Sequence, residues 1–155
     1  RHIDRQSAAR LDRVRRYYLE LRRADGTDGS SADPAVLCSG DANAPNWRLR
    51  ADGSLVLIDW QIPSLAPAAQ DLAGWIATML DFSDIETVAR VYRGQPDPDL
   101  ARDVAACFCR RCATNFWRYE TAATPALRAA WEPGIERMRE VLPDWLERLV
   151  GEAGF

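Results

Sequence analysis

Through most of the chain, apolar side chains recur every three or four residues, which is the period of an amphipathic helix. In the first segment, Leu11, Val14, Tyr18 and Leu21 follow this spacing, with Arg and Asp between them. The same spacing predicts helices over five segments, at residues 3–24, 69–80, 85–92, 100–119 and 125–150.

Prolines mark one helix start and interrupt the last helical segment. Thr124 followed by Pro125 is typical of an N-cap and a first helical position. Pro133 and Pro143 lie further inside that segment. Proline has no backbone N–H to donate, so these two residues are expected to kink or divide the helix.

Short apolar runs predict strands at residues 36–38, 47–50 and 54–58. The second and third flank Ala51-Asp52-Gly53, a turn signal typical of a β-hairpin. Two segments are expected to be irregular because they are rich in Gly, Ser and Asp or in Pro: residues 25–34 and 61–69. These patterns predict one α+β domain over residues 1–155, mainly helical with a small hairpin near its start.

Charge and hydropathy exclude several classes of protein. The net charge is −3, which argues against a nucleic-acid partner because such proteins usually carry a basic face. No apolar run approaches the length of a membrane span and no signal peptide is visible, so a cytoplasmic protein without membrane contact is expected. The all-arginine, alanine-rich composition suggests a bacterial genome rich in GC.

The four cysteines allow two interpretations. Cys107, Cys109 and Cys112 lie close together in a predicted helix, which suggests a metal site. A closed zinc site usually has four ligands, however, and the only histidine, His2, is at the terminus. Reduced thiols buried in the core of a cytosolic protein, Cys38 included, are the favoured interpretation.

Two acidic residues and an amide form the most informative pattern. Asp41 is followed five positions later by Asn46, and Asp59 comes after the hairpin at the end of an apolar strand. Phosphoryl transfer needs one carboxylate to accept or orient a hydroxyl proton. It also needs an amide oxygen and a second carboxylate to hold Mg²⁺. Each residue alone could be an ordinary turn or strand-end residue.

Together the segments Ser39-Gly40-Asp41…Asn46, Ile58-Asp59-Trp60 and Asp71-Leu72-Ala73 resemble the aminoglycoside phosphotransferase and choline kinase families, which share the protein-kinase-like fold. The resemblance implies ATP as co-substrate and Mg²⁺ as cofactor. It makes Asp41 the catalytic base or hydroxyl-orienting residue, and Asn46 and Asp59 the Mg²⁺ ligands. Asp71 and Ser39 would support the catalytic loop.

The chain departs from the family pattern at two places. Ser39 and Asn43 stand where the family usually has histidines. The chain also contains no lysine, although the family's small N-terminal lobe supplies a lysine to the nucleotide phosphates. The chain is therefore expected to be the large C-terminal lobe, inactive when isolated and missing its N-terminal lobe. The alternatives are a catalytically inactive kinase-like binding module and a helical interaction domain with an accidental match.

The residues are compatible with several classes of substrate. The resemblance implies a small molecule with a hydroxyl group, such as an aminoglycoside, choline or a sugar. Six tryptophans are a high number for this length, and aromatic faces can bind quaternary ammonium ions. Trp60 and Trp75 are the candidates for substrate binding by position, although core packing is the commoner role of such residues.

Overall fold

The computed structural model describes residues 9–13, 16, 35–60, 62–76, 83–121 and 124–152. Residues 9–13 and 16 are helical, in agreement with the first predicted helix. The rest of that helix, the loop predicted at 25–34 and the end of the helix predicted at 69–80 lie outside the described residues.

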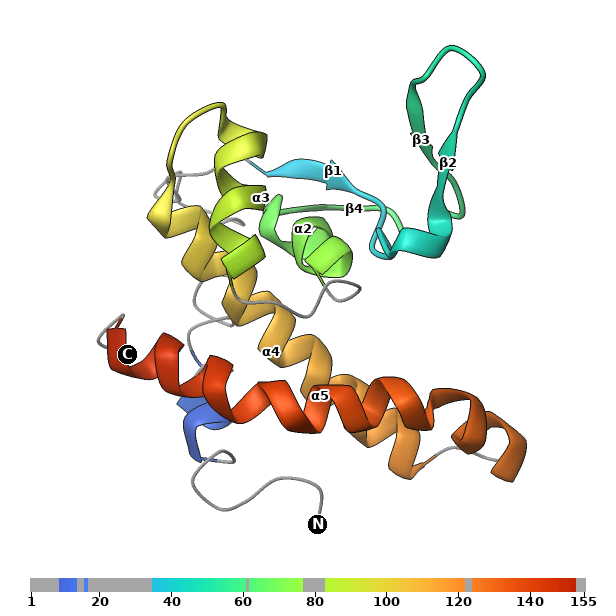
Figure 1. Ribbon diagram of the computed structural model, residues 1–155, viewed down its shortest axis with the longest axis vertical. Helices are drawn as coiled ribbons and strands as arrows, with labels where there is room; N and C mark the ends of the chain where they lie inside the picture. The colour runs from blue at the N-terminus through green and yellow to red at the C-terminus, as the bar shows by residue number, and fades with distance from the viewer. Residues whose placement is uncertain are drawn as a thin grey trace.

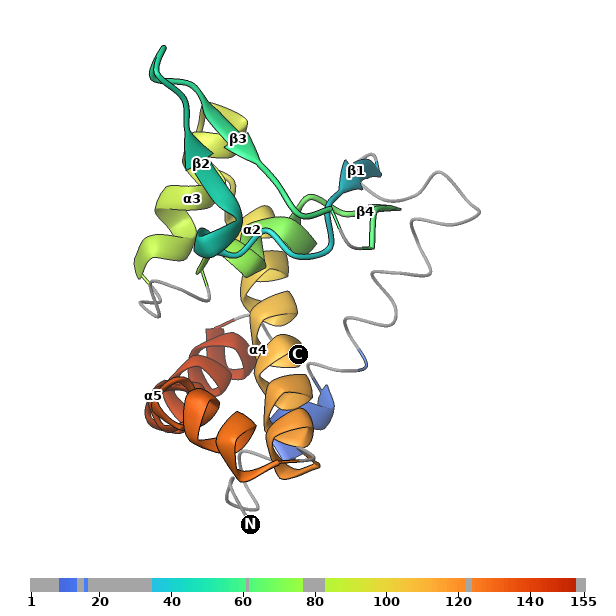
Figure 2. The same ribbon diagram turned by 90° about the vertical axis from the view of Figure 1, so that its right-hand side faces the viewer.

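Two small antiparallel sheets lie at one end of the molecule. Strand β1 (Val36–Cys38) pairs with β4 (Ser64–Ala66), and β2 (Trp47–Leu49) pairs with β3 (Leu55–Leu57). The 3-10 turn η1 (Ala44–Asn46) precedes the hairpin. In Figures 1 and 2 the β2–β3 hairpin projects away from the helices. The predicted first strand and hairpin are confirmed to within one residue at each end.

Strand β4 contradicts the expectation of irregular structure over residues 61–69. Its three residues lie between Pro63 and Pro67, the prolines on which that expectation rests. In a two-stranded sheet each strand is an edge, and proline is tolerated at the ends of edge strands. Leu37 faces Leu65 across this sheet, and both are exposed.

Four helices form the body of the molecule: α2 (Ala69–Ile76), α3 (Ser83–Arg93), α4 (Pro98–Glu120) and α5 (Pro125–Glu152). Two of them begin with a side-chain cap. Asp97 accepts a hydrogen bond from the Leu100 amide at 2.9 Å, and Thr124 accepts one from the Leu127 amide at 3.2 Å. The predicted cap at Thr124 is therefore confirmed.

Helix α5 is continuous through Pro133 and Pro143, so the expectation that these prolines divide it is wrong. A proline inside a helix costs about 3 kcal/mol because it removes a hydrogen bond and crowds the preceding turn. Burial of apolar side chains offsets this cost, since Leu142, Trp145 and Leu146 are almost fully buried.

The core lies where α4 packs against α2, α3 and α5, as Figure 1 shows. At its centre the rings of Phe108 and Trp145 are 4.1 Å apart between centroids. No helix in the described part of the chain is both long and apolar enough to cross a bilayer. The catalytic-loop candidates lie at the strand-bearing end of this body.

All four cysteines are free and buried. Burial raises the pKa of Cys38 from its ordinary value of 9.0 to about 11, and it raises the pKa values of Cys109 and Cys112 further. Among the described residues, no cluster of three or more His, Cys, Asp or Glu side chains is placed to hold a metal ion. The burial of the four thiols places them in the core, as the favoured interpretation expects.

We expect the free energy of unfolding to fall as pH rises from 9 to 11, because the unfolded chain ionises its thiols at lower pH than the folded chain does. The stabilising contribution is fully present below pH 9. Urea unfolding at several pH values in this range measures how steeply the free energy of unfolding falls with pH. This fall should be shallower in Cys38→Ala. An equal fall in both proteins would contradict the contribution of the Cys38 thiol.

Candidate active site

Residues 39–46, here called the 39–46 loop, connect β1 to the hairpin and pass close to α2. Gly40 has a φ of +78°, and a Cβ at this position would lie 2.8 Å from the Ile62 carbonyl oxygen. Only glycine fits such a conformation without strain. A Cβ on Gly74 of α2 would lie 3.4 Å from the Ala42 backbone, so the loop and the helix are already in close contact.

Asp71, in the first turn of α2, holds the start of this loop. Its Oδ2 accepts a hydrogen bond from the Ser39 amide at 2.6 Å, and its Oδ1 accepts one from the Gly40 amide at 3.0 Å. Ser39 is fully buried, and its hydroxyl accepts a hydrogen bond from the Asp41 amide at 3.2 Å. Ser39 thus bonds within the loop at the position where the resembled families have histidine.

The Asp41 carboxylate lies in the middle of the loop and accepts hydrogen bonds from its neighbours. Its Oδ1 accepts from Asn43 Nδ2 at 2.5 Å, and its Oδ2 accepts from Asn46 Nδ2 at 3.1 Å. The same Asn46 nitrogen donates to the Asp41 carbonyl at 2.8 Å. Within the described residues, Oδ1 is therefore the atom of the Asn46 amide that remains to bind a cation.

The side chain of Arg111 of α4 also reaches the loop, and the sequence analysis did not predict this contact. Its Nη2 donates to Asp41 Oδ1 and to Asn43 Oδ1, each at 2.9 Å. A charged residue between Cys109 and Cys112 in a buried stretch of helix requires a partner, and this signal could have indicated a contact. The sequence alone does not say that the partner is Asp41.

The hairpin register places Asp59 directly after the end of the β2–β3 ladder. The Ile58 amide donates to the Asn46 carbonyl at 2.8 Å, which extends the β2–β3 ladder to the end of the loop. Asp59 follows immediately, is exposed, and has a left-handed φ of 61°. Such a conformation is rare for a non-glycine residue and occurs often at functional sites. Hydrogen bonds thus join Ser39, Asp41, Asn46 and Asp71 in one network, and Asp59 follows Ile58, the residue whose amide bonds to Asn46.

An apolar groove of about 710 Å³ lies next to the loop, between the hairpin and helices α2 and α3. Its aromatic lining residues are Trp47, Trp60, Trp75 and Tyr92. The Trp47 and Trp75 rings meet edge to face with centroids 5.5 Å apart, and Trp47 Nε1 donates to the Ala42 carbonyl at 3.2 Å. Trp60 and Trp75 therefore share one groove, which adjoins the loop at Ala42.

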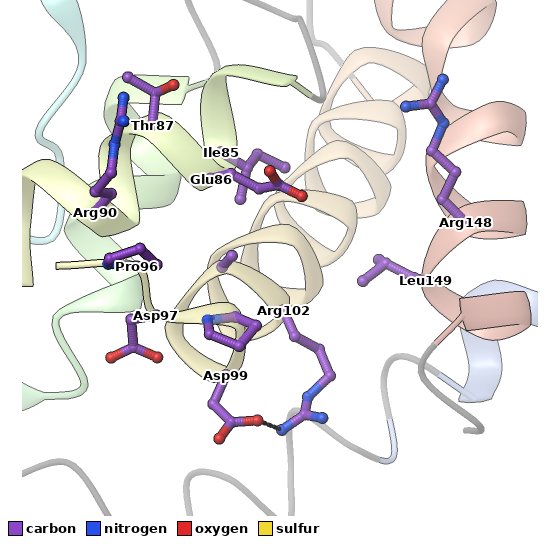
Figure 3. A pocket seen from close by; sticks show the side chains of 12 residues that line it. Ile85, Glu86, Thr87, Arg90, Pro96, Asp97, Asp99, Arg102, Arg148 and Leu149 are labelled. Carbon is purple, nitrogen blue, oxygen red and sulfur yellow. Dashed lines mark hydrogen bonds and ion pairs between the residues drawn. The ribbon is translucent and has the colours of Figure 1, made fainter.

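A second cavity of about 710 Å³ lies between α3, the start of α4 and the end of α5, as Figure 3 shows. Two of its arginines form ion pairs with acidic side chains. Arg102 pairs with Asp99 at 2.6 Å and Arg148 with Asp144 at 3.2 Å. None of its described lining residues belongs to the 39–46 loop, so this cavity is separate from the candidate active site.

Comparison with known proteins gives one match. The model of the phosphotransferase enzyme family matches residues 1–106 of the 155, a span that includes the whole 39–46 loop, Asp59 and Asp71. Arg111 lies beyond the matched span. No curated protein and no solved structure matches the chain.

Proposed function

The chain belongs to the phosphotransferase enzyme family, and from this premise we propose that it carries the catalytic loop for transfer of the γ-phosphoryl group of ATP to a hydroxyl group of a small molecule. One observation carries the proposal. Asp41, Asn46 and Asp71, which lie apart in the sequence, belong to one hydrogen-bonded network at the loop.

In this reaction the substrate hydroxyl oxygen attacks the γ-phosphorus, the bond to the bridging oxygen breaks, and ADP leaves with that oxygen. The hydroxyl proton moves to Asp41 or, through Asp41, to solvent. The carboxylate of Asp41 orients the hydroxyl for in-line attack, which is the main contribution of protein groups in such reactions. Asp71 holds the loop backbone and so limits the motion of Asp41.

The residues present fit Mg²⁺, which prefers oxygen ligands. Asn46 offers an amide oxygen, because its nitrogen is used by Asp41, and Asp59 offers a carboxylate at the strand end. These two residues would hold the ion, which would neutralise the phosphates of the nucleotide.

The composition suggests that a second lobe binds the nucleotide phosphates. No lysine is present to bind the nucleotide phosphates. We therefore assign residues 1–155 to the large C-terminal lobe and expect a segment upstream in the natural protein to supply the phosphate-binding group. The 155-residue chain alone should be inactive for this reason.

The groove beside the loop suits a substrate with an apolar or quaternary ammonium group. Trp60 and Trp75 line it, aromatic faces attract such cations, and the net charge of −3 favours a cationic substrate. Aminoglycosides and choline are the classes to test first, with neutral sugars as the comparison.

The test uses the natural protein that contains these residues, incubated with Mg²⁺, γ-labelled ATP and each class of hydroxyl compound in turn. The expected result is label in the acceptor and a mass increase of one phosphoryl group. Nucleotide binding without transfer to any acceptor would instead support a catalytically inactive kinase-like binding module.

Asp59→Asn separates metal binding from folding. Asparagine tolerates the left-handed backbone at this position, so the thermal midpoint should stay close to that of the wild type. Loss of the carboxylate should raise the Mg²⁺ concentration needed for half-maximal activity by about tenfold or more. A tenfold change corresponds to a loss of about 1.4 kcal/mol in the free energy of Mg²⁺ binding. A magnesium titration measures this, and an unchanged requirement would remove Asp59 from the ligand set.

A further inference from the structure

Arg111 forms the longest-range contact of the 39–46 loop, since it lies 70 residues from Asp41 in the sequence. The Arg111 side chain is 22% exposed and the Asp41 side chain is 32% exposed, so the pair is partly shielded from water. Charge-assisted hydrogen bonds in such surroundings are stronger and more directional than those between fully exposed groups.

The packing around Arg111 leaves space for the guanidinium. On α4, the neighbouring residues Cys109 and Cys112 are fully buried, which fixes the helix against the core. On α2, Gly74 has no side chain, and a Cβ there would lie 3.5 Å from Arg111 Nη1. The guanidinium therefore passes beside α2 and reaches Asp41 and Asn43 in the loop.

The contact closes a ring of three side chains. Arg111 Nη2 donates to both Asp41 Oδ1 and Asn43 Oδ1, while Asn43 Nδ2 donates to Asp41 Oδ1. Asp41 Oδ1 thus accepts two hydrogen bonds, which fills its two lone pairs. Among the described residues, Asp41 Oδ2 accepts one side-chain bond, from Asn46, which leaves one of its acceptor positions for the substrate hydroxyl.

We propose that Arg111 is a positioning residue that holds the Asp41 carboxylate with Oδ2 turned toward the substrate hydroxyl. This inference rests on the proposed phosphotransferase function. The positive charge of Arg111 also offsets the charge of Asp41, which must stand close to the negatively charged phosphates of the nucleotide. A lysine would keep the charge but not the planar group that bridges Asp41 and Asn43.

The test compares Arg111→Ala, Arg111→Lys and Arg118→Ala in the natural protein. Arg118 is an exposed arginine on the same helix, so its removal is a matched control. Arg111→Ala should lower kcat by about 10–100-fold with little change in the KM for ATP, because a small misplacement of a reacting group has an effect of this size. The kcat of Arg111→Lys should lie between those of Arg111→Ala and the wild type. The kcat of Arg118→Ala should equal that of the wild type.

Two further readouts separate positioning from a general structural role. Added methylguanidine should restore part of the kcat of Arg111→Ala and have no effect on Arg118→Ala. Mn²⁺ binding, followed by electron paramagnetic resonance, should become tighter in Arg111→Ala, because removal of the cation leaves the Asp41 charge uncompensated. If Arg111→Ala fails to fold, Arg111→Gln replaces it in the same comparison.

The outcomes distinguish the two proposals. A wild-type protein that transfers no phosphoryl group overturns the proposed function and with it the catalytic purpose of Arg111. An active wild type with unchanged kcat in the Arg111 variants overturns the positioning role alone. A loss of kcat without rescue by methylguanidine, and with weaker Mn²⁺ binding, shows a structural role and also overturns it.

Discussion

Replacing Asp41 by asparagine should lower kcat by about 10²–10⁴-fold, the range over which acid–base and hydroxyl-orienting groups act. Asparagine has nearly the same shape and can still accept a hydrogen bond from Asn46. It can neither accept the substrate proton nor balance the charge of Arg111. Nucleotide affinity should change little, because Asp41 is not one of the proposed Mg²⁺ ligands.

Steady-state kinetics and nucleotide titration on the natural protein measure both quantities. Asp52→Asn is the control, because Asp52 lies in the exposed turn of the hairpin and caps it through Ser54. Its activity should equal that of the wild type. Retained turnover in Asp41→Asn would show that Asp41 does not act on the hydroxyl.

The largest effect on stability is expected for Asp71→Ala. The carboxylate accepts hydrogen bonds from the amides of Ser39 and Gly40 at 2.6 and 3.0 Å. Hydrogen bonds to a charged group contribute about 1.5–3 kcal/mol each, so loss of both should lower the free energy of unfolding by about 3–6 kcal/mol. Urea unfolding of the 155-residue chain measures the change.

Asp71→Asn is the matched variant for that measurement. It keeps the shape and one acceptor oxygen, so it should lose roughly half as much stability as Asp71→Ala. The exposed Asp99 offers a second comparison, because Asp99→Ala should cost less than about 1 kcal/mol. Equal stability of Asp71→Ala and the wild type would mean that α2 does not anchor the loop.

Local patterns in the sequence were sufficient to predict the hairpin and the described parts of the helices. The apolar spacing and the turn at residues 51–53 act within a few residues, so their structural effect can be read directly. Strand β4 was missed because two prolines flank it, and its pairing with β1 depends on residues 28 positions away. Likewise, α5 stays whole through its prolines because of tertiary burial, which no local rule contains.

In the candidate site, too, the contacts within the loop could be predicted from the sequence, whereas the contact that depends on tertiary packing could not. The spacing of Asp41 and Asn46 predicts one short loop, and the structure joins these side chains by hydrogen bonds within it. The contact with Arg111 could not be predicted, because it depends on how α4 packs against α2 and the loop. The roles of Asp41, Asn46 and Asp59 in catalysis and metal binding stay predictions.

A crystal structure of the natural protein with Mg²⁺ and a non-hydrolysable ATP analogue would test the proposed roles of the 39–46 loop and Asp59 most directly. We expect Asn46 Oδ1 and an Asp59 carboxylate oxygen at about 2.0–2.1 Å from a Mg²⁺ ion that also contacts the phosphates. We expect the Asp41 carboxylate to face the γ-phosphate without binding the metal. Magnesium bound elsewhere, or nucleotide phosphates far from the 39–46 loop, would contradict these roles.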